Sequence, residues 1–134
     1  MGWFGNLFGR KPEAGFTRFE GDGSFECDVV GESNYQDALN RIAGGKTEDG
    51  HEFECTARLV PEPGNPHDSN AVMVMIDGRQ VGYLSRAHAQ AMTILFQRKG
   101  LGGAEADALV VGGWKRGRGA KDEGHYGVKL DLPI

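Results

Sequence analysis

The chain has 134 residues, 39% hydrophobic and 25% charged, which predicts one domain with its own core. No apolar run approaches the ~20 residues of a membrane-spanning helix, and no signal-peptide core is present, so a cytoplasmic protein without a membrane span is expected. Glycine occurs 22 times, roughly double its usual share of about 7%, which favours short strands joined by turns.

The formal net charge of −4 hides an asymmetry along the chain. Residues 1–78 carry 14 acidic and 6 basic side chains (−8), and residues 79–134 carry 5 and 9 (+4), which together give −4. Phosphate groups are bound by one face of a protein, so the basic second half suits a nucleic-acid binder. A solvated basic edge explains the same charges.

Residues 1–24 predict a flexible tail, because six glycines interrupt any helix. The tail has clustered aromatic and aliphatic residues at Trp3, Phe4, Leu7 and Phe8, which suit docking on the domain or on a partner. The folded domain is expected over residues 25–134.

The next segments alternate between strand and helix signals. Residues 25–30 predict a first strand. Ser33 and Gln36 form an S-x-x-Q capping box, which predicts a helix that begins at Ser33 and ends at a Gly-Gly pair. Residues 51–61 alternate apolar and polar side chains, which predicts a half-buried strand.

Residues 59–84 predict three antiparallel strands in a meander. Three prolines stiffen the first turn, and together with Gly64 they exclude a helix there. The apolar run 71–76 follows, and then Asp77-Gly78, a dipeptide that suits the positive φ angles of a tight hairpin.

The last third adds a helix and a strand pair. Ser85 can cap a helix to about Lys99, which a glycine ends. Strands are expected over residues 108–114 and 126–132, joined by a basic, mobile loop over 115–124. The predicted fold is mainly β with two helices, a small OB-like, partly open antiparallel barrel of about six strands.

Enzyme and metal motifs are not found in the sequence. It has no phosphate-binding loop, G-x-G-x-x-G turn, nucleophile elbow or H-E-x-x-H helix. Cys27 and Cys55 are expected to be buried thiols, and the histidines lack ligand spacing. We therefore expect no enzyme, no cofactor and no metal. The histidines are His51, His67, His88 and His125.

Two segments of the meander carry a specific family resemblance. Residues 62–72 read EPGNPHDSNAV and residues 81–84 read VGYL. They resemble the HIRAN domain, whose signature is an E/D-P-x-N-P-[YH]-D-x-N-A-[VI] turn and then a V-G-[YH]-[LI] strand. Upstream, Val29-Val30-Gly31 and Tyr35 resemble the family's first strand and the segment after it. The resemblance covers residues 25–134 and implies an OB-like barrel.

The resemblance also implies a function. HIRAN domains occur at the front of Swi/Snf-type helicase-like DNA repair enzymes and as small stand-alone bacterial and phage proteins. The repair-enzyme form binds single-stranded DNA at a free 3′ end. A non-catalytic module for single-stranded DNA or DNA ends in repair or replication is therefore implied, with a helicase or other repair protein as partner.

The family's pocket residues fall on named positions of this chain. The turn supplies His67 and Asp68, the strand after it supplies Tyr83, and Arg86 is the basic residue that follows. Tyr35 corresponds to the tyrosine of the first-strand segment. A late-hairpin aromatic falls on Tyr126, and a surrounding basic funnel is expected from Arg79, Lys115, Arg116 and Arg118.

These residue types suit the implied chemistry. Tyr35, Tyr83 and His67 offer flat faces for unstacked bases, each worth about 1–3 kcal/mol. Asp68 can accept a terminal 3′-hydroxyl proton, and Arg86 can bind phosphate. Structural roles for Tyr83 at a barrel rim and for Asp68 in the turn compete with these assignments and are compatible with them.

The chain departs from the DNA-binding pattern after the V-V-G segment. Ser33 and Asn34 stand where that pattern has a basic and an aromatic residue. Two pocket contacts are therefore missing, which predicts weaker or altered single-strand binding.

A second hypothesis is a protein-interaction adaptor that uses the aromatic tail and the acidic first half of the chain.

Overall fold

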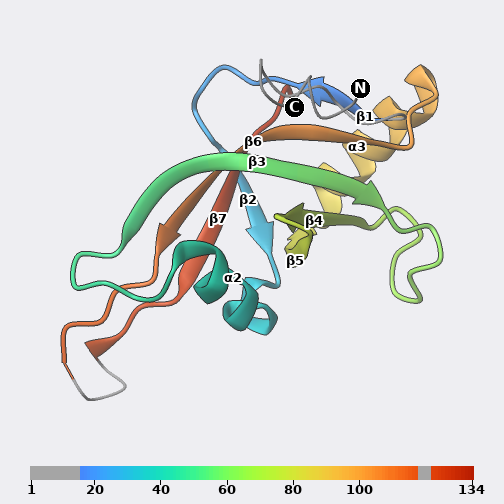
Figure 1. Ribbon diagram of the computed structural model, residues 1–134. Helices are drawn as coiled ribbons and strands as arrows, with labels where there is room; N and C mark the ends of the chain where they lie inside the picture. Colours follow the sequence, from blue (N-terminus) through green and yellow to red (C-terminus); the bar gives the residue numbers. More distant parts are fainter. Residues whose placement is uncertain (1–15, 118–121) are drawn as a thin grey trace, which may run out of the picture.

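The computed structural model describes residues 16–117 and 122–134 (Figure 1). These residues form seven strands, two α-helices and one 3-10 turn. In chain order they are β1 (Phe16–Phe19), β2 (Cys27–Val30), η1 (Glu32–Asn34), α2 (Gln36–Ala43), β3 (His51–Pro61), β4 (Val72–Ile76), β5 (Arg79–Leu84), α3 (Arg86–Lys99), β6 (Gly103–Gly112) and β7 (Tyr126–Asp131). Within the described residues, no helix is long and apolar enough to cross a membrane.

Six of these strands close into a barrel. The ring runs β6-β3-β4-β5-β2-β7, and the pairing of β6 with β7 completes it. Each neighbouring pair in the ring is antiparallel. The predicted fold class, a small mainly β barrel of about six strands with two helices, is confirmed, and the β6–β7 pairing closes a barrel that was expected to be partly open.

Strand β1 lies within the segment that the sequence assigned to the tail. It pairs in parallel with the start of β6, from Phe16 opposite Gly103 to Phe19 opposite Ala106. A Cβ on Gly103 would meet the Phe16 ring of β1 and would lie 2.6 Å from the Leu59 carbonyl oxygen of β3, so only glycine fits between these two strands. Strand β6 therefore begins at Gly103, before the predicted start at residue 108. The rest of the expected tail, residues 1–15, lies outside the described residues, and the division of the chain at residue 24 stays a prediction.

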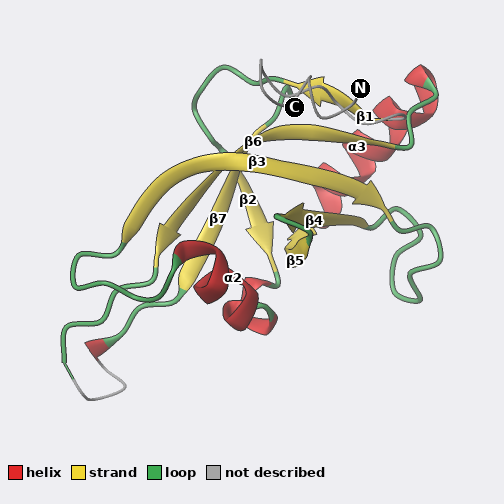
Figure 2. Cartoon of the chain, in the orientation of Figure 1, coloured by secondary structure: helices red, strands yellow, loops and turns green. Residues whose placement is uncertain are grey.

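The two helices cover different parts of the barrel (Figure 2). Helix α2 packs against β5 and β7 and buries Leu39 completely. Helix α3 buries Ala89, Met92 and Phe96, and the Phe96 ring stacks on Phe19 of β1 at a centroid distance of 6.1 Å. Met92 and Phe96 are two of the apolar positions that the sequence offers for the buried face of this helix, whereas Ala87 and Ala91 are exposed.

The capping box predicted at Ser33 does not form. Helix α2 begins at Gln36, after η1, and no side chain caps its first turn. The Gln36 amide instead donates to the carbonyl oxygens of Glu32 (3.0 Å) and Tyr126 (3.1 Å), and its oxygen accepts from the Tyr126 N–H (2.8 Å). The amide satisfies both of its polar ends against β7, which the local motif does not predict.

Three local predictions are confirmed. Asp77 and Gly78 have φ angles of 51° and 72°, as the tight β4–β5 hairpin requires. The Ser85 hydroxyl accepts from the His88 N–H at 3.2 Å and caps α3, and Gly100 ends it with a φ of 64°. The prediction of two buried thiols holds for Cys27, whereas Cys55 is free but only half-buried.

Candidate functional site

The turn between β3 and β4, residues 62–71, is closed by its own backbone. The Glu62 N–H donates to the Ala71 carbonyl (2.8 Å), and the Asn65 N–H donates to the Glu62 carbonyl (3.0 Å). The Ala71 N–H donates to the Asp68 carbonyl (3.0 Å). The Asn70 carbonyl accepts from the Thr93 hydroxyl of α3 (3.2 Å), which fastens the turn to the helix.

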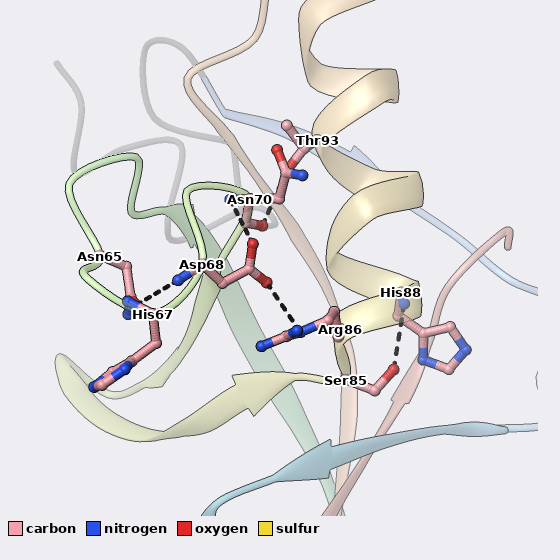
Figure 3. A network of polar contacts seen from close by, with 8 residues as sticks. All are labelled: Asn65, His67, Asp68, Asn70, Ser85, Arg86, His88 and Thr93. Atoms are coloured by element: carbon pink, nitrogen blue, oxygen red, sulfur yellow. Dashed lines mark hydrogen bonds and ion pairs between the residues drawn. The ribbon is translucent and has the colours of Figure 1, made fainter.

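Two side chains shape this turn from within (Figure 3). The Asn65 side-chain oxygen accepts from the N–H groups of His67 (2.8 Å) and Asp68 (3.1 Å). Asp68 Oδ1 accepts from the Asn70 N–H at 2.9 Å. The predicted turn role of Asp68 is thus confirmed, and the hydrogen bond that it makes in the turn uses one of its two carboxylate oxygens.

The other oxygen of Asp68 faces a cation on α3. Asp68 Oδ2 lies 3.9 Å from Arg86 Nε, as Figure 3 shows. The Arg86 side chain is 80% exposed and that of Asp68 is 22% exposed. An exposed pair at this distance is weak, so the guanidinium group can turn toward a ligand at little cost.

An open hollow of about 270 Å³ lies between the turn and the end of β5. Ala71 and Leu84 give it an apolar floor, and both are buried. Its rim is polar or charged. A flat apolar group with a polar edge suits this combination. The lining residues are Asn65, His67, Asp68, Ala71, Tyr83, Leu84 and Arg86.

Tyr83 and Tyr35 lie together beside the hollow, next to Glu62. The Tyr83 hydroxyl donates to Glu62 Oε1 at 3.0 Å, and the Asn65 Nδ2 donates to the same oxygen at 2.6 Å. Burial raises the pKa of the Tyr35 phenol, and the neighbouring Tyr83 and Glu62 raise it further. Glu62 is the first residue of the turn motif and was not among the predicted site residues.

Ser33 and Asn34 lie in η1, directly before Tyr35 in the chain. Val30, which ends β2, pairs with Tyr83 of β5, and the turn of η1 follows directly. A Cβ on Gly82 would lie 2.6 Å from the Val30 carbonyl oxygen, so the two strands approach closely here. Both η1 residues are exposed. The two departures from the family pattern therefore lie on the Tyr83 side of the hollow.

Tyr126 does not belong to the hollow. Its side chain is only 3% exposed, and its hydroxyl donates to Asn40 Oδ1 of α2 at 2.8 Å. Its ring packs against His51 at a centroid distance of 5.7 Å, and burial raises the pKa of its phenol. The expected base contact at Tyr126 is corrected, because a buried ring that holds α2 on β7 offers no face for stacking.

The basic residues of the expected funnel do not gather at the hollow. Arg79 follows the β4–β5 hairpin, at the opposite end of β5 from Leu84. Lys115 and Arg116 follow β6, and Figure 1 shows their hairpin and the 62–71 turn at opposite ends of β3. Eleven strand residues span about 33 Å, which separates the two ends.

The hairpin residues have partners of their own. The Arg116 guanidinium lies 4.8 Å from the centroid of the Trp114 ring, and its Nε donates to the Glu48 carbonyl at 3.1 Å. Lys115 forms an isolated bridge with Glu123 through the backbone. Arg118 lies outside the described residues. Of the predicted site residues, the structure thus brings together Tyr35, His67, Asp68, Tyr83 and Arg86.

Two comparisons with known proteins found matches. The HIRAN domain family matches residues 22–106, a range that contains every residue lining the hollow. The crystal structure of the HIRAN domain of human HLTF is similar, with 21% sequence identity, a TM-score of 0.39, and 80% of this chain and 73% of that chain covered. No curated protein matches the chain. With the family matched across β2 to β5 and α3, the chain belongs to the HIRAN domain family.

Proposed function

We propose that this chain is a non-catalytic module that binds single-stranded DNA or DNA ends through the hollow beside the 62–71 turn. One observation carries the proposal. An aromatic side chain (Tyr83), an acceptor (Asp68) and an exposed cation (Arg86) surround one hollow in a member of the HIRAN family, whose domains bind nucleic acid.

Each group has a distinct part in this proposal. A terminal base lies against Tyr83 or Tyr35, which contributes about 1–3 kcal/mol per stacked base. Arg86 binds the adjoining phosphate. Asp68 Oδ2 accepts a hydrogen bond from a terminal 3′-hydroxyl, because Oδ1 already accepts from the Asn70 N–H.

The carboxylate also selects against other groups. A phosphate at the Asp68 position meets a like charge, so a free 3′-hydroxyl is favoured over an internal or terminal phosphate there. The absence of a basic and an aromatic side chain at Ser33 and Asn34 makes the binding weaker than in the DNA-binding pattern described for the family.

The setting of this function is part of the proposal. We place it in DNA repair or replication, beside a helicase or other repair protein, on the strength of the family resemblance. The free thiols of Cys27 and Cys55 suit the reducing cytoplasm.

Fluorescence anisotropy with short labelled strands tests the proposal. Strands with a free 3′-hydroxyl and with a 3′-phosphate are titrated at low salt against the wild-type chain and the Tyr83→Ala variant. We expect binding that favours the free hydroxyl and weakens by about tenfold in the variant, the effect of losing one stacked base. If the wild-type chain binds neither strand at low salt, the proposal is wrong; equal affinity for both strands removes only the end-reading part.

A further inference from the structure

We infer that Glu62 is a positioning residue of the binding site, whose carboxylate holds Tyr83 and the 62–71 turn in one arrangement. The inference rests on the proposed function and adds a residue that does not itself line the hollow. Glu62 acts through two neighbours, Tyr83 and Asn65.

A single oxygen of Glu62 joins two walls of the hollow. Oε1 accepts from the Tyr83 hydroxyl of β5 at 3.0 Å and from Asn65 Nδ2 of the turn at 2.6 Å. Hydrogen bonds to an ionised acceptor are shorter and stronger than those between neutral groups. The carboxylate therefore ties an aromatic side chain to a turn that lies 18 residues earlier in the chain.

The bond to Asn65 also decides how that amide is oriented. With Nδ2 directed at Glu62, the Asn65 oxygen faces the N–H groups of His67 (2.8 Å) and Asp68 (3.1 Å). A flipped amide would set two donors against those N–H groups. Glu62 thus fixes, through Asn65, the backbone that presents His67 and Asp68.

This role explains why an acidic side chain, Glu62, lies beside a proposed site for single-stranded DNA, which is a polyanion. A carboxylate there repels phosphate, which is a cost in binding. Glu62 is instead half-buried and directed at two donors. Tyr35 lies against the same group, since Glu62 and Tyr83 both raise the pKa of its phenol after the larger effect of burial. The Glu62 carboxylate thus lies against Tyr35 and Tyr83 and holds the Tyr83 side chain in place.

Four variants and one control test the inference with a short strand that has a free 3′-hydroxyl, at low salt. Glu62→Ala removes the acceptor, and we expect the dissociation constant to rise about tenfold. Glu62→Gln keeps an oxygen that can accept from both donors, so its dissociation constant should stay within about twofold of wild type. Glu54→Ala removes an exposed carboxylate from β3, the strand that leads into the turn, and should change nothing.

Tyr83→Phe and the double variant Glu62→Ala/Tyr83→Phe separate this role from simple loss of fold. The phenylalanine keeps a ring for stacking and loses only the hydroxyl that Glu62 accepts. We expect the double variant to lose less affinity than the product of the two single losses, because both remove the same bond. Tyr83→Phe also keeps the test decisive if Glu62→Ala does not fold, since it alone should weaken binding.

The outcomes distinguish this inference from the proposed function. No binding by the wild-type chain overturns the proposed function and this inference with it. Wild-type binding that Tyr83→Phe and Glu62→Ala leave unchanged overturns the inference alone. A Glu62→Gln variant as weak as Glu62→Ala, or single losses that multiply in the double variant, overturns it as well.

Discussion

Arg86 Nε at the start of α3 lies 3.9 Å from Asp68 Oδ2 in the turn between β3 and β4. The two side chains bring opposite charges to the rim of one hollow, from positions 18 residues apart. Neither side chain uses all of its polar groups in contacts that hold the fold. Arg86 is largely exposed, and Asp68 uses only its other oxygen to hold the turn. The pair can therefore open for a ligand that has a hydroxyl beside a phosphate.

Asp68→Asn tests whether the carboxylate charge selects the strand end. The asparagine oxygen can still accept from the Asn70 N–H, so the turn is expected to keep its shape. Loss of the negative charge should strengthen binding of a 3′-phosphorylated strand by at least about fivefold, roughly 1 kcal/mol. Anisotropy with matched 3′-hydroxyl and 3′-phosphate strands measures this. An unchanged ratio of the two affinities would count against the end-reading role.

Arg86→Ala tests the phosphate contact. Removing one cation should weaken binding of all sequences alike and lower the slope of log K against log salt by about 0.7, the value for one contact to a single strand. Arg98→Ala is the matched control, because Arg98 is also exposed on α3 and lies three turns away. Equal effects of both variants would indicate a general charge effect in place of a contact at the hollow.

Tyr126→Phe tests the structural role assigned to Tyr126. The change leaves Asn40 without its hydroxyl partner, so the free energy of unfolding should fall by about 0.5–1.5 kcal/mol. Affinity for single strands should not change, since the ring lies outside the hollow. Urea unfolding and anisotropy measure the two effects. A loss of affinity without a loss of stability would contradict this structural role and indicate that Tyr126 contacts the strand.

Gly103→Ala tests the packing of β1 against the barrel. The new methyl group would lie 2.6 Å from the Leu59 carbonyl oxygen and against the Phe16 ring. Overpacking of this kind costs about 1–3 kcal/mol, which urea unfolding can measure. Gly64→Ala is the control, because a Cβ there meets nothing within 4 Å. Similar stabilities of the two variants would contradict the described close packing of Gly103 between Phe16 of β1 and Leu59 of β3.

Cys55 predicts a pH dependence of stability. Burial raises the pKa of its thiol from 9.0 to about 11, so the folded chain holds the proton more tightly than the unfolded chain. The stabilisation is complete below pH 9 and is lost as the pH rises from 9 to 11. Wild type should therefore lose more stability than Cys55→Ala over this window, as urea unfolding at several pH values can show. Parallel curves for the two proteins would rule the effect out.

Local signals in the sequence predicted the parts of the fold that local chemistry decides. The proline-stiffened turn, the Asp77-Gly78 hairpin and the Ser85 cap depend on neighbouring residues, and the structure has all three. The half-buried strand 51–61 and the last strand follow from alternation of side chains in the same way.

Contacts between distant segments decided what the sequence did not predict. Strand β1 depends on a glycine 87 residues after Phe16, and the start of α2 depends on Gln36 bonding to Tyr126, 90 residues away. The hairpin that contains Lys115 lies at one end of β3 and the 62–71 turn lies at the other, so the length of this strand separates Lys115 from the hollow. In the proposed site, the motif located His67 and Asp68, but the role inferred for Glu62 rests on its hydrogen bond to Tyr83, which the motif does not predict.

An NMR titration of the isotopically labelled chain with a short single strand, read residue by residue, tests the central claim most directly. We predict that the amide signals of residues 62–71 and of Tyr83 to Arg86 shift together and saturate at one ligand per chain, with little change at Lys115 and Arg116. Shifts concentrated at the hairpin of Lys115 and Arg116, or no shifts at low salt, would contradict the assignment of the hollow as the nucleic-acid site.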